Sequence, residues 1–105
     1  MLNKINKLEK KIGINFNDKK LLIKSLTHKS FNSIDNNEKL EFLGDRVLGL
    51  IISKKLLELY PNDTEGVLDK KLSSLVNKKI CCKVGKKINL HDFIIFLFLE
   101  EQLIL

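Results

Sequence analysis

Tryptophan is absent from this sequence, proline occurs once and cysteine twice among 105 residues. Aliphatic residues and lysine dominate instead, a composition typical of a helical protein rather than a β-sandwich or a disordered tail. The two cysteines, Cys81 and Cys82, are adjacent, and this spacing suits neither a zinc site nor an ordinary disulfide. We therefore expect two reduced thiols in a reducing compartment.

Long hydrophobic runs are also missing. The longest uninterrupted apolar run, Phe93 to Leu99, is far shorter than the roughly 20 residues that a membrane-spanning helix needs. The first residues, MLNKINKLEKK, lack the apolar stretch of a secretory signal. The sequence therefore predicts no membrane segment and a cytoplasmic location.

Acidic residues are the minority among charged ones, 13 against 19 basic residues, which gives a net charge of +6 and a pI near 9.4. Such a charge permits a polyanionic partner such as nucleic acid. The signal is weak, because Arg46 is the one arginine and every other basic residue is lysine. A mass of 12.1 kDa leaves room for one small domain.

Hydrophobic periodicity predicts helices along the chain and no strand, and so an all-α fold. The first helix ends at Gly13. The second is capped by Asn17 and buries Leu21, Leu22, Ile23 and Leu26. A long helix opens at Asp35 or Asn36 and runs to about Tyr60, where Pro61 ends it.

Two more helices are expected after Pro61. The next starts at Asp63 or Thr64, and its inward residues are Val67, Leu68, Leu72, Leu75 and Val76. A shorter helix covers residues 80–87, and the sequence from Leu90 onward is hydrophobic without a clear period. The whole is predicted to be one helical bundle.

Three carboxylates occur within the apolar segment NEKLEFLGDRVLGL of the long helix, residues 37–50. At about 100° per residue, Glu38, Glu41 and Asp45 share a stripe about 60° wide, with Phe42 beside it. A separate apolar face, expected to pack against the other helices, is formed by Leu40, Leu43, Val47 and Leu50. The acids therefore point to a partner that compensates their charge.

Two interpretations of the stripe remain open. A divalent cation such as Mg²⁺ accepts one or two carboxylates and completes its shell with water and phosphate oxygens, which would suit a phosphodiesterase. Alternatively, Asp35 and Glu38 form a capping box, and Glu41 and Asp45 pair with Lys39, Arg46 or lysines from elsewhere.

The same segment resembles the signature of the ribonuclease III family, Asn-Glu-Arg-Leu-Glu-Phe-Leu-Gly-Asp-Ala-Val-Leu. Lys39 replaces the usual arginine and Arg46 the usual alanine, and every other position fits. The flanking segments LLIKSLTHKSF and YPNDTEGVLDKKLSSLVN also resemble those of the family. The resemblance covers roughly residues 5–92.

The resemblance implies an all-α ribonuclease III endonuclease domain that forms a homodimer and cleaves double-stranded RNA. It implies phosphodiester hydrolysis that depends on Mg²⁺, or on Mn²⁺ in its place, with no small-molecule cofactor, and a role in rRNA and mRNA processing. Glu41 and Asp45 match the family's metal-ligand and catalytic positions, and Glu65 matches an acid close to the cleavage site. Glu38 and Phe42 match positions at the dimer interface.

Other features depart from the family's pattern. Family members carry a second acidic motif, Asp-x-x-Glu, whereas the late acids here, Asp92, Glu100 and Glu101, do not form it. The double-stranded RNA-binding domain common in bacterial members is also not found. We therefore expect residues 1–105 to be a partial endonuclease domain, incomplete at its C-terminus through a frameshift or premature stop, and with impaired activity.

Two alternative functions stay open. The chain could be a non-catalytic dimeric module that binds structured RNA or a ribosomal partner, or a helical interaction module whose acids are surface charges. His28 and Ser30, which resemble a second family motif, are expected to have a structural role.

Overall fold

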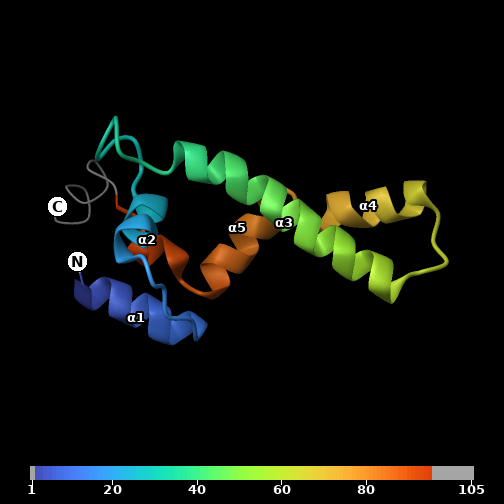
Figure 1. Cartoon of the computed structure of the whole chain (residues 1–105), viewed down its shortest axis with the longest axis horizontal. Coiled ribbons are helices and arrows are strands. Elements are labelled where there is room, and N and C mark those ends of the chain that lie inside the picture. Colours follow the sequence, from blue (N-terminus) through green and yellow to red (C-terminus); the bar gives the residue numbers. More distant parts are fainter. Residues whose placement is uncertain (1, 96–105) are drawn as a thin grey trace.

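The computed structural model describes residues 2–95. These residues form five α-helices and a short 3₁₀-helix: α1 (Leu2–Ile12), α2 (Lys19–Leu26), α3 (Glu38–Leu59), α4 (Glu65–Leu75), α5 (Lys78–Lys87) and η1 (Leu90–Phe93). Figure 1 shows α1 and α2 at one end, and α3 running from them to the far end, where α4 turns back alongside it. The predicted all-α fold is confirmed, and the expectations for residues 96–105 lie outside the described residues.

Side-chain caps begin three of the helices. Asp18 accepts a hydrogen bond from the backbone N–H of Leu21 (3.0 Å) at α2, so the cap is one residue later than the predicted Asn17. Thr64, one of the two residues predicted to start α4, caps this helix. Asn77 caps α5 by accepting from the N–H of Ile80 (2.9 Å), which places the start of this helix before residue 80. Each bond satisfies a backbone donor that the first helical turn leaves unpaired.

The long helix α3 begins at Glu38, later than the predicted Asp35 or Asn36. Asn36 is buried and shapes the preceding loop instead, because its side chain donates to the carbonyl of Asn32 (3.0 Å) and accepts from the N–H of Glu38 (3.0 Å). Asp35 pairs with Lys24 (3.4 Å). The helix ends before Tyr60, as predicted.

The hydrophobic core lies between α1, α2 and η1. Ile5 and Leu8 from α1 pack with Leu22 and Leu26 from α2, and Leu90 and Phe93 are among the partly buried residues that close the cluster. A single parallel β-bridge joins Thr27 to Ile95 and fastens the end of the described chain to α2. Leu21, predicted to be buried, is 48% exposed because it lies on the outer side of α2.

A buried carboxylate stabilises the same end of the molecule. Glu9 is 4% exposed, and its side chain accepts hydrogen bonds from the Lys19 ammonium and from the backbone N–H of Phe16. These bonds, with Lys19 the larger contribution, lower the pKa of Glu9 below its ordinary value of 4.5. This ion pair was not predicted from the sequence, although Glu9 follows Ile5 by four residues and so lies on the same face of α1.

The other half of the molecule is open. The radius of gyration is 16.5 Å, where a compact chain of this length has about 13 Å. Leu56 is the one buried residue of α3, and it lies against α4. Within residues 2–95, no helix is both long and apolar enough to span a membrane.

The predicted packing of the apolar face of α3 is wrong for the described chain. Leu43, Val47 and Leu50 are 57%, 45% and 71% exposed. The inward positions predicted for α4 are likewise wrong at Val67 and Leu75, which are exposed. Periodicity correctly places these residues on helix faces, but within residues 2–95 none of them is buried.

Candidate active site

An open cleft of about 690 Å³ separates the first half of α3 from the start of α5. Glu38, Glu41 and Asp45 lie on the α3 wall, as the predicted stripe requires. The opposite wall includes Lys78 and Cys81 of α5. The cleft therefore places a lysine across from the acids.

Glu41 and Asp45 have no compensating cation within residues 2–95. Neither carboxylate takes part in an ion pair there, although both are one helical turn apart on an exposed face. Arg46 turns away from Asp45: its guanidinium donates to the carbonyl of Phe42 (3.0 Å) and lies 3.7 Å from the centre of the Phe42 ring. The predicted pairing of these acids with Lys39 or Arg46 is therefore not observed.

Glu38 differs from the two other acids. Its carboxylate lies 3.7 Å from the Lys29 ammonium, and both side chains are exposed, so the pair contributes little to stability. Asn37, not Asp35, precedes the helix, and it makes no side-chain capping bond. The capping-box interpretation of Asp35 and Glu38 is therefore wrong.

The chemistry of Glu41 and Asp45 suits a hard divalent cation. Mg²⁺ is bound in proteins by one or two carboxylates, with water and substrate phosphates as its other ligands. Residues 2–95 contain no cluster of three or more histidine, cysteine, aspartate or glutamate side chains arranged for a metal. Asp92, the one late acid in this range, lies beside His91 on η1 (3.3 Å). The described part of the chain thus places Glu41 and Asp45 in the cleft without a group of three ligands that could hold a metal.

Phe42 lines the cleft and is 61% exposed. A large aromatic side chain exposed in this way indicates a surface that a partner covers. Its role at a dimer interface, together with that of Glu38, stays a prediction.

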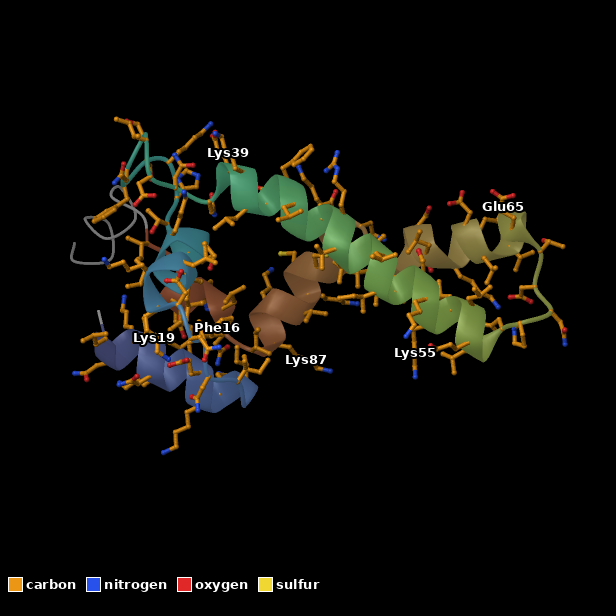
Figure 2. All side chains as sticks on the ribbon, viewed as in Figure 1. Phe16, Lys19, Lys39, Lys55, Glu65 and Lys87 are labelled. Carbon is orange, nitrogen blue, oxygen red and sulfur yellow. The ribbon has the colours of Figure 1, made fainter. Side chains whose placement is uncertain are left out.

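Glu65 lies far from the other acids. It lines a separate cleft of about 280 Å³ between α3 and α4, together with Ser53 and Asp69. Figure 2 shows Glu65 at the far end of the molecule, whereas Lys39 marks the opposite end of α3, near the acidic stripe. Within one chain the structure does not bring Glu65 together with Glu41 and Asp45.

His28 and Ser30 form a turn after α2. The Nδ1 atom of His28 lies 2.8 Å from the hydroxyl of Ser30 and accepts from the Ser30 N–H (3.1 Å). The N–H of His28 donates to the carbonyl of Ile95 (2.9 Å). These contacts agree with the structural role expected for both residues.

The α5 wall of the cleft was not foreseen. Asn77 could have been identified as a helix cap from its position before KKICCKV, but the placement of Lys78 and Cys81 opposite the acids depends on how α4 and α5 turn back across α3. That turn is a tertiary feature, for which the sequence pattern gave no signal.

Comparison with known proteins identifies the family. A family model described as "Ribonuclease-III-like" matches residues 18–103. The chain is 69% identical over 91 residues to Ribonuclease 3 of Pelagibacter ubique, an alignment that covers 87% of this chain and 41% of that protein. It is 46% identical over 101 residues to Ribonuclease 3 of Campylobacter jejuni, covering 96% of this chain and 45% of that protein. The chain thus spans less than half the length of these relatives.

Solved structures agree with the sequence comparisons. The nuclease domain of ribonuclease III from Campylobacter jejuni, in a structure described as flexible in the region involved in dimer formation, matches with a TM-score of 0.88 and 47% identity. The match covers 93% of this chain and 68% of that domain. A second structure of that domain gives a TM-score of 0.85. Sequence and fold together show that this chain belongs to the ribonuclease III family.

Proposed function

We propose that the chain is the signature-helix part of an endonuclease that hydrolyses phosphodiester bonds of double-stranded RNA. The observation that carries the proposal is the pair Glu41 and Asp45, which face an open cleft without a compensating cation in the described residues. Membership of the ribonuclease III family, and relatives named Ribonuclease 3, support the reaction and the substrate.

Glu41 and Asp45 are the residues proposed to hold Mg²⁺, or Mn²⁺ in its place. Such a metal polarises a phosphodiester and lowers the pKa of a bound water. The two carboxylates bind and orient it from one helix face, where their spacing is fixed by the backbone of α3. The openness of the cleft admits a bulky polymer, and no small-molecule cofactor is required.

A homodimer forms part of the proposal. Phe42 and Glu38 both line the cleft, and a second copy of the chain would cover the exposed ring of Phe42. Because Glu65 lies at the other end of α3, a role near the same cleavage site requires it to come from a second subunit. Processing of rRNA and mRNA in the cytoplasm is the proposed setting.

One observation favours a second candidate function. Residues 2–95 contain no group of three or more histidine, cysteine, aspartate or glutamate side chains that could hold a metal ion together. A non-catalytic relative that binds structured RNA through the same helices would have this property, and its mark would be salt-sensitive duplex binding without cleavage.

The deciding experiment is the cleavage of a long RNA duplex by the purified chain with Mg²⁺, with and without chelator. Asp45→Asn should lower the rate by about 100-fold or more, since even the groups that support metal ligands are worth 10- to 100-fold. Asp35→Asn, which changes an exposed aspartate that lines neither cleft, should cut like the wild type.

Metal-dependent cutting that is lost in Asp45→Asn but kept in Asp35→Asn supports the endonuclease. Wild-type cutting no faster than that of Asp45→Asn, together with duplex binding, would replace it with the non-catalytic module.

A further inference from the structure

A row of three unlike side chains runs along the first half of α3. Glu38, Phe42 and Arg46 follow one another at intervals of four residues, so they form one ridge of the helix surface, which we call the α3 ridge. All three side chains are exposed and line the open cleft. In Figure 2, Lys39 marks the turn of α3 at which the ridge begins. The ridge therefore presents an acid, an aromatic ring and a base, in that order.

The aromatic ring holds the arginine of the ridge in place. The Arg46 guanidinium lies 3.7 Å from the centre of the Phe42 ring and donates to the Phe42 carbonyl (3.0 Å). A guanidinium has five N–H donors, so a stacked arginine still has donors for a carboxylate. Within residues 2–95, Arg46 pairs with no carboxylate. Since Arg46 replaces the usual alanine of the family signature, the basic end of the ridge belongs to this chain in particular.

The acid of the ridge has only a weak partner. The Glu38 carboxylate lies 3.7 Å from the Lys29 ammonium, which is too far for a hydrogen bond, and both side chains are exposed. Such a pair contributes little to stability, so Glu38 loses little when it takes a closer partner. Both charged ends of the ridge, about 12 Å apart along the helix axis, are therefore available for an interaction between molecules.

The order of the side chains selects the kind of partner. A surface of a single charge sign, such as a polyanion, attracts one end of the ridge and repels the other. A second copy of the same ridge, running in the opposite direction, places a base against each acid. A two-fold axis produces this antiparallel arrangement, because it brings the same patch of both copies together. The α3 ridge is therefore complementary to itself.

Helix packing allows two such ridges to meet. Ridges of residues four apart lie parallel to each other when two helices cross at about −50°, the commonest class of helix contact. In an antiparallel pair centred on Phe42, Arg46 of one copy lies at the level of Glu38 of the other, since both are four residues, or about 6 Å, from the centre. The exposed Phe42 ring lies in the middle of the contact, where it is removed from water.

We propose that two copies of the chain join through their α3 ridges, with Arg46 of each copy paired with Glu38 of the other. The inference rests on the homodimer of the proposed function and names the residue that sets its specificity, because Arg46 selects a partner with an acid at the position of Glu38. The pair occurs twice in a symmetric dimer, so each substitution removes two interactions. Burial beside the Phe42 rings places both pairs in a lower dielectric than open water, which strengthens them.

The test is the dissociation constant of the dimer, measured for the full chain by sedimentation equilibrium without metal or RNA. Arg46→Ala should raise this constant about 30-fold, which equals about 2 kcal/mol for the two pairs together. Arg46→Glu places like charges at both contacts, so it should abolish the dimer at concentrations at which the wild type dimerises. The matched control is Lys55→Glu, which makes the same change of charge at an exposed lysine of α3 that lies outside the ridge and has no ion pair within residues 2–95. It should leave the dissociation constant unchanged.

A charge swap tests whether the two side chains face each other. Glu38→Arg alone should prevent self-association, because both ends of the ridge are then basic. A mixture of the Glu38→Arg chain with the Arg46→Glu chain should form a heterodimer, since every base then faces an acid. The double variant Glu38→Arg, Arg46→Glu should form a homodimer again. Circular dichroism of each variant checks that the helices are retained.

The outcomes separate this inference from the proposed function. A wild-type dimer that is unaffected by Arg46→Glu, or equally weakened by Lys55→Glu, overturns the pairing of the ridges and leaves the homodimer intact. Dissociation in both single variants without a heterodimer in their mixture also overturns it, because the two side chains then do not face each other. A wild type that stays monomeric at every attainable concentration overturns the homodimer as well, whereas the cleavage of duplex RNA tests the endonuclease separately.

Discussion

Two leucines on α3 provide a direct measure of how much of this helix is packed. Leu56 is 6% exposed, whereas Leu50 is 71% exposed. Leu56→Ala removes buried methylene groups and leaves a cavity against α4, so it should lower the free energy of unfolding by about 2–5 kcal/mol. Leu50→Ala removes a side chain already in water, so its effect should stay within about 0.5 kcal/mol. Leucine and alanine are both strong helix formers, which makes the pair well matched.

Urea unfolding followed by circular dichroism tests the comparison. With a slope of about 2 kcal/mol per molar urea, a loss of 3 kcal/mol moves the midpoint by about 1.5 M. Equal losses in the two variants would refute the reasoning, because they would mean that Leu50 is buried in solution. A loss that grows with protein concentration in Leu50→Ala would identify a second copy of the chain as the cover.

Three further results are expected. Because the folded-state pKa of Glu9 is lowered, its contribution to stability is complete above about pH 4.5 and is lost as the pH falls below that value. In thermal unfolding between pH 3 and 6, the stability of Glu9→Gln should therefore depend less on pH than that of the wild type. Asn77→Ala removes the cap of α5 and should lower the free energy of unfolding by about 1 kcal/mol in urea unfolding. Asn37 makes no capping bond, so Asn37→Ala should leave that free energy nearly unchanged. Gly13→Ala should destabilise the chain, because the φ of Gly13 is +72°, whereas Gly49→Ala within α3 should stabilise it by up to about 1 kcal/mol in the same assay.

Local signals in the sequence were sufficient for much of the fold. Thr64 marks the start of α4, because a side-chain cap acts within a few residues. Pro61 marks the end of α3, because a proline lacks the backbone N–H that would continue the helix. The start of α3 was misplaced for a non-local reason: the N–H of Asn37 donates to the carbonyl of Thr27 (3.0 Å), ten residues earlier, and keeps the intervening residues out of the helix. Periodicity alone does not contain that contact.

In the candidate site, too, some residues could be placed from the sequence and others only from the tertiary structure. Glu41 and Asp45 share a face because α-helical geometry fixes it, so the sequence was enough to place them together. Lys78, on the facing wall, comes from more than 30 residues later and reaches the cleft through the turn between α4 and α5. The exposure of Leu43 could not be predicted either, since an apolar helix face indicates that a side chain is suited to burial but does not show which segment packs against it.

The bridge between Thr27 and Ile95 has a consequence for synthesis on the ribosome. The N-terminal core is completed by Leu90 and Phe93. Ile95, which forms the bridge to Thr27, follows it by 68 positions in the sequence. At a translation rate of roughly 5–20 residues per second, Ile95 is added about 3–14 s after Thr27. Until η1 is made, the cluster of Ile5, Leu8, Leu22 and Leu26 lacks Leu90 and Phe93, so the nascent chain is expected to present these apolar side chains to chaperones until translation has passed η1.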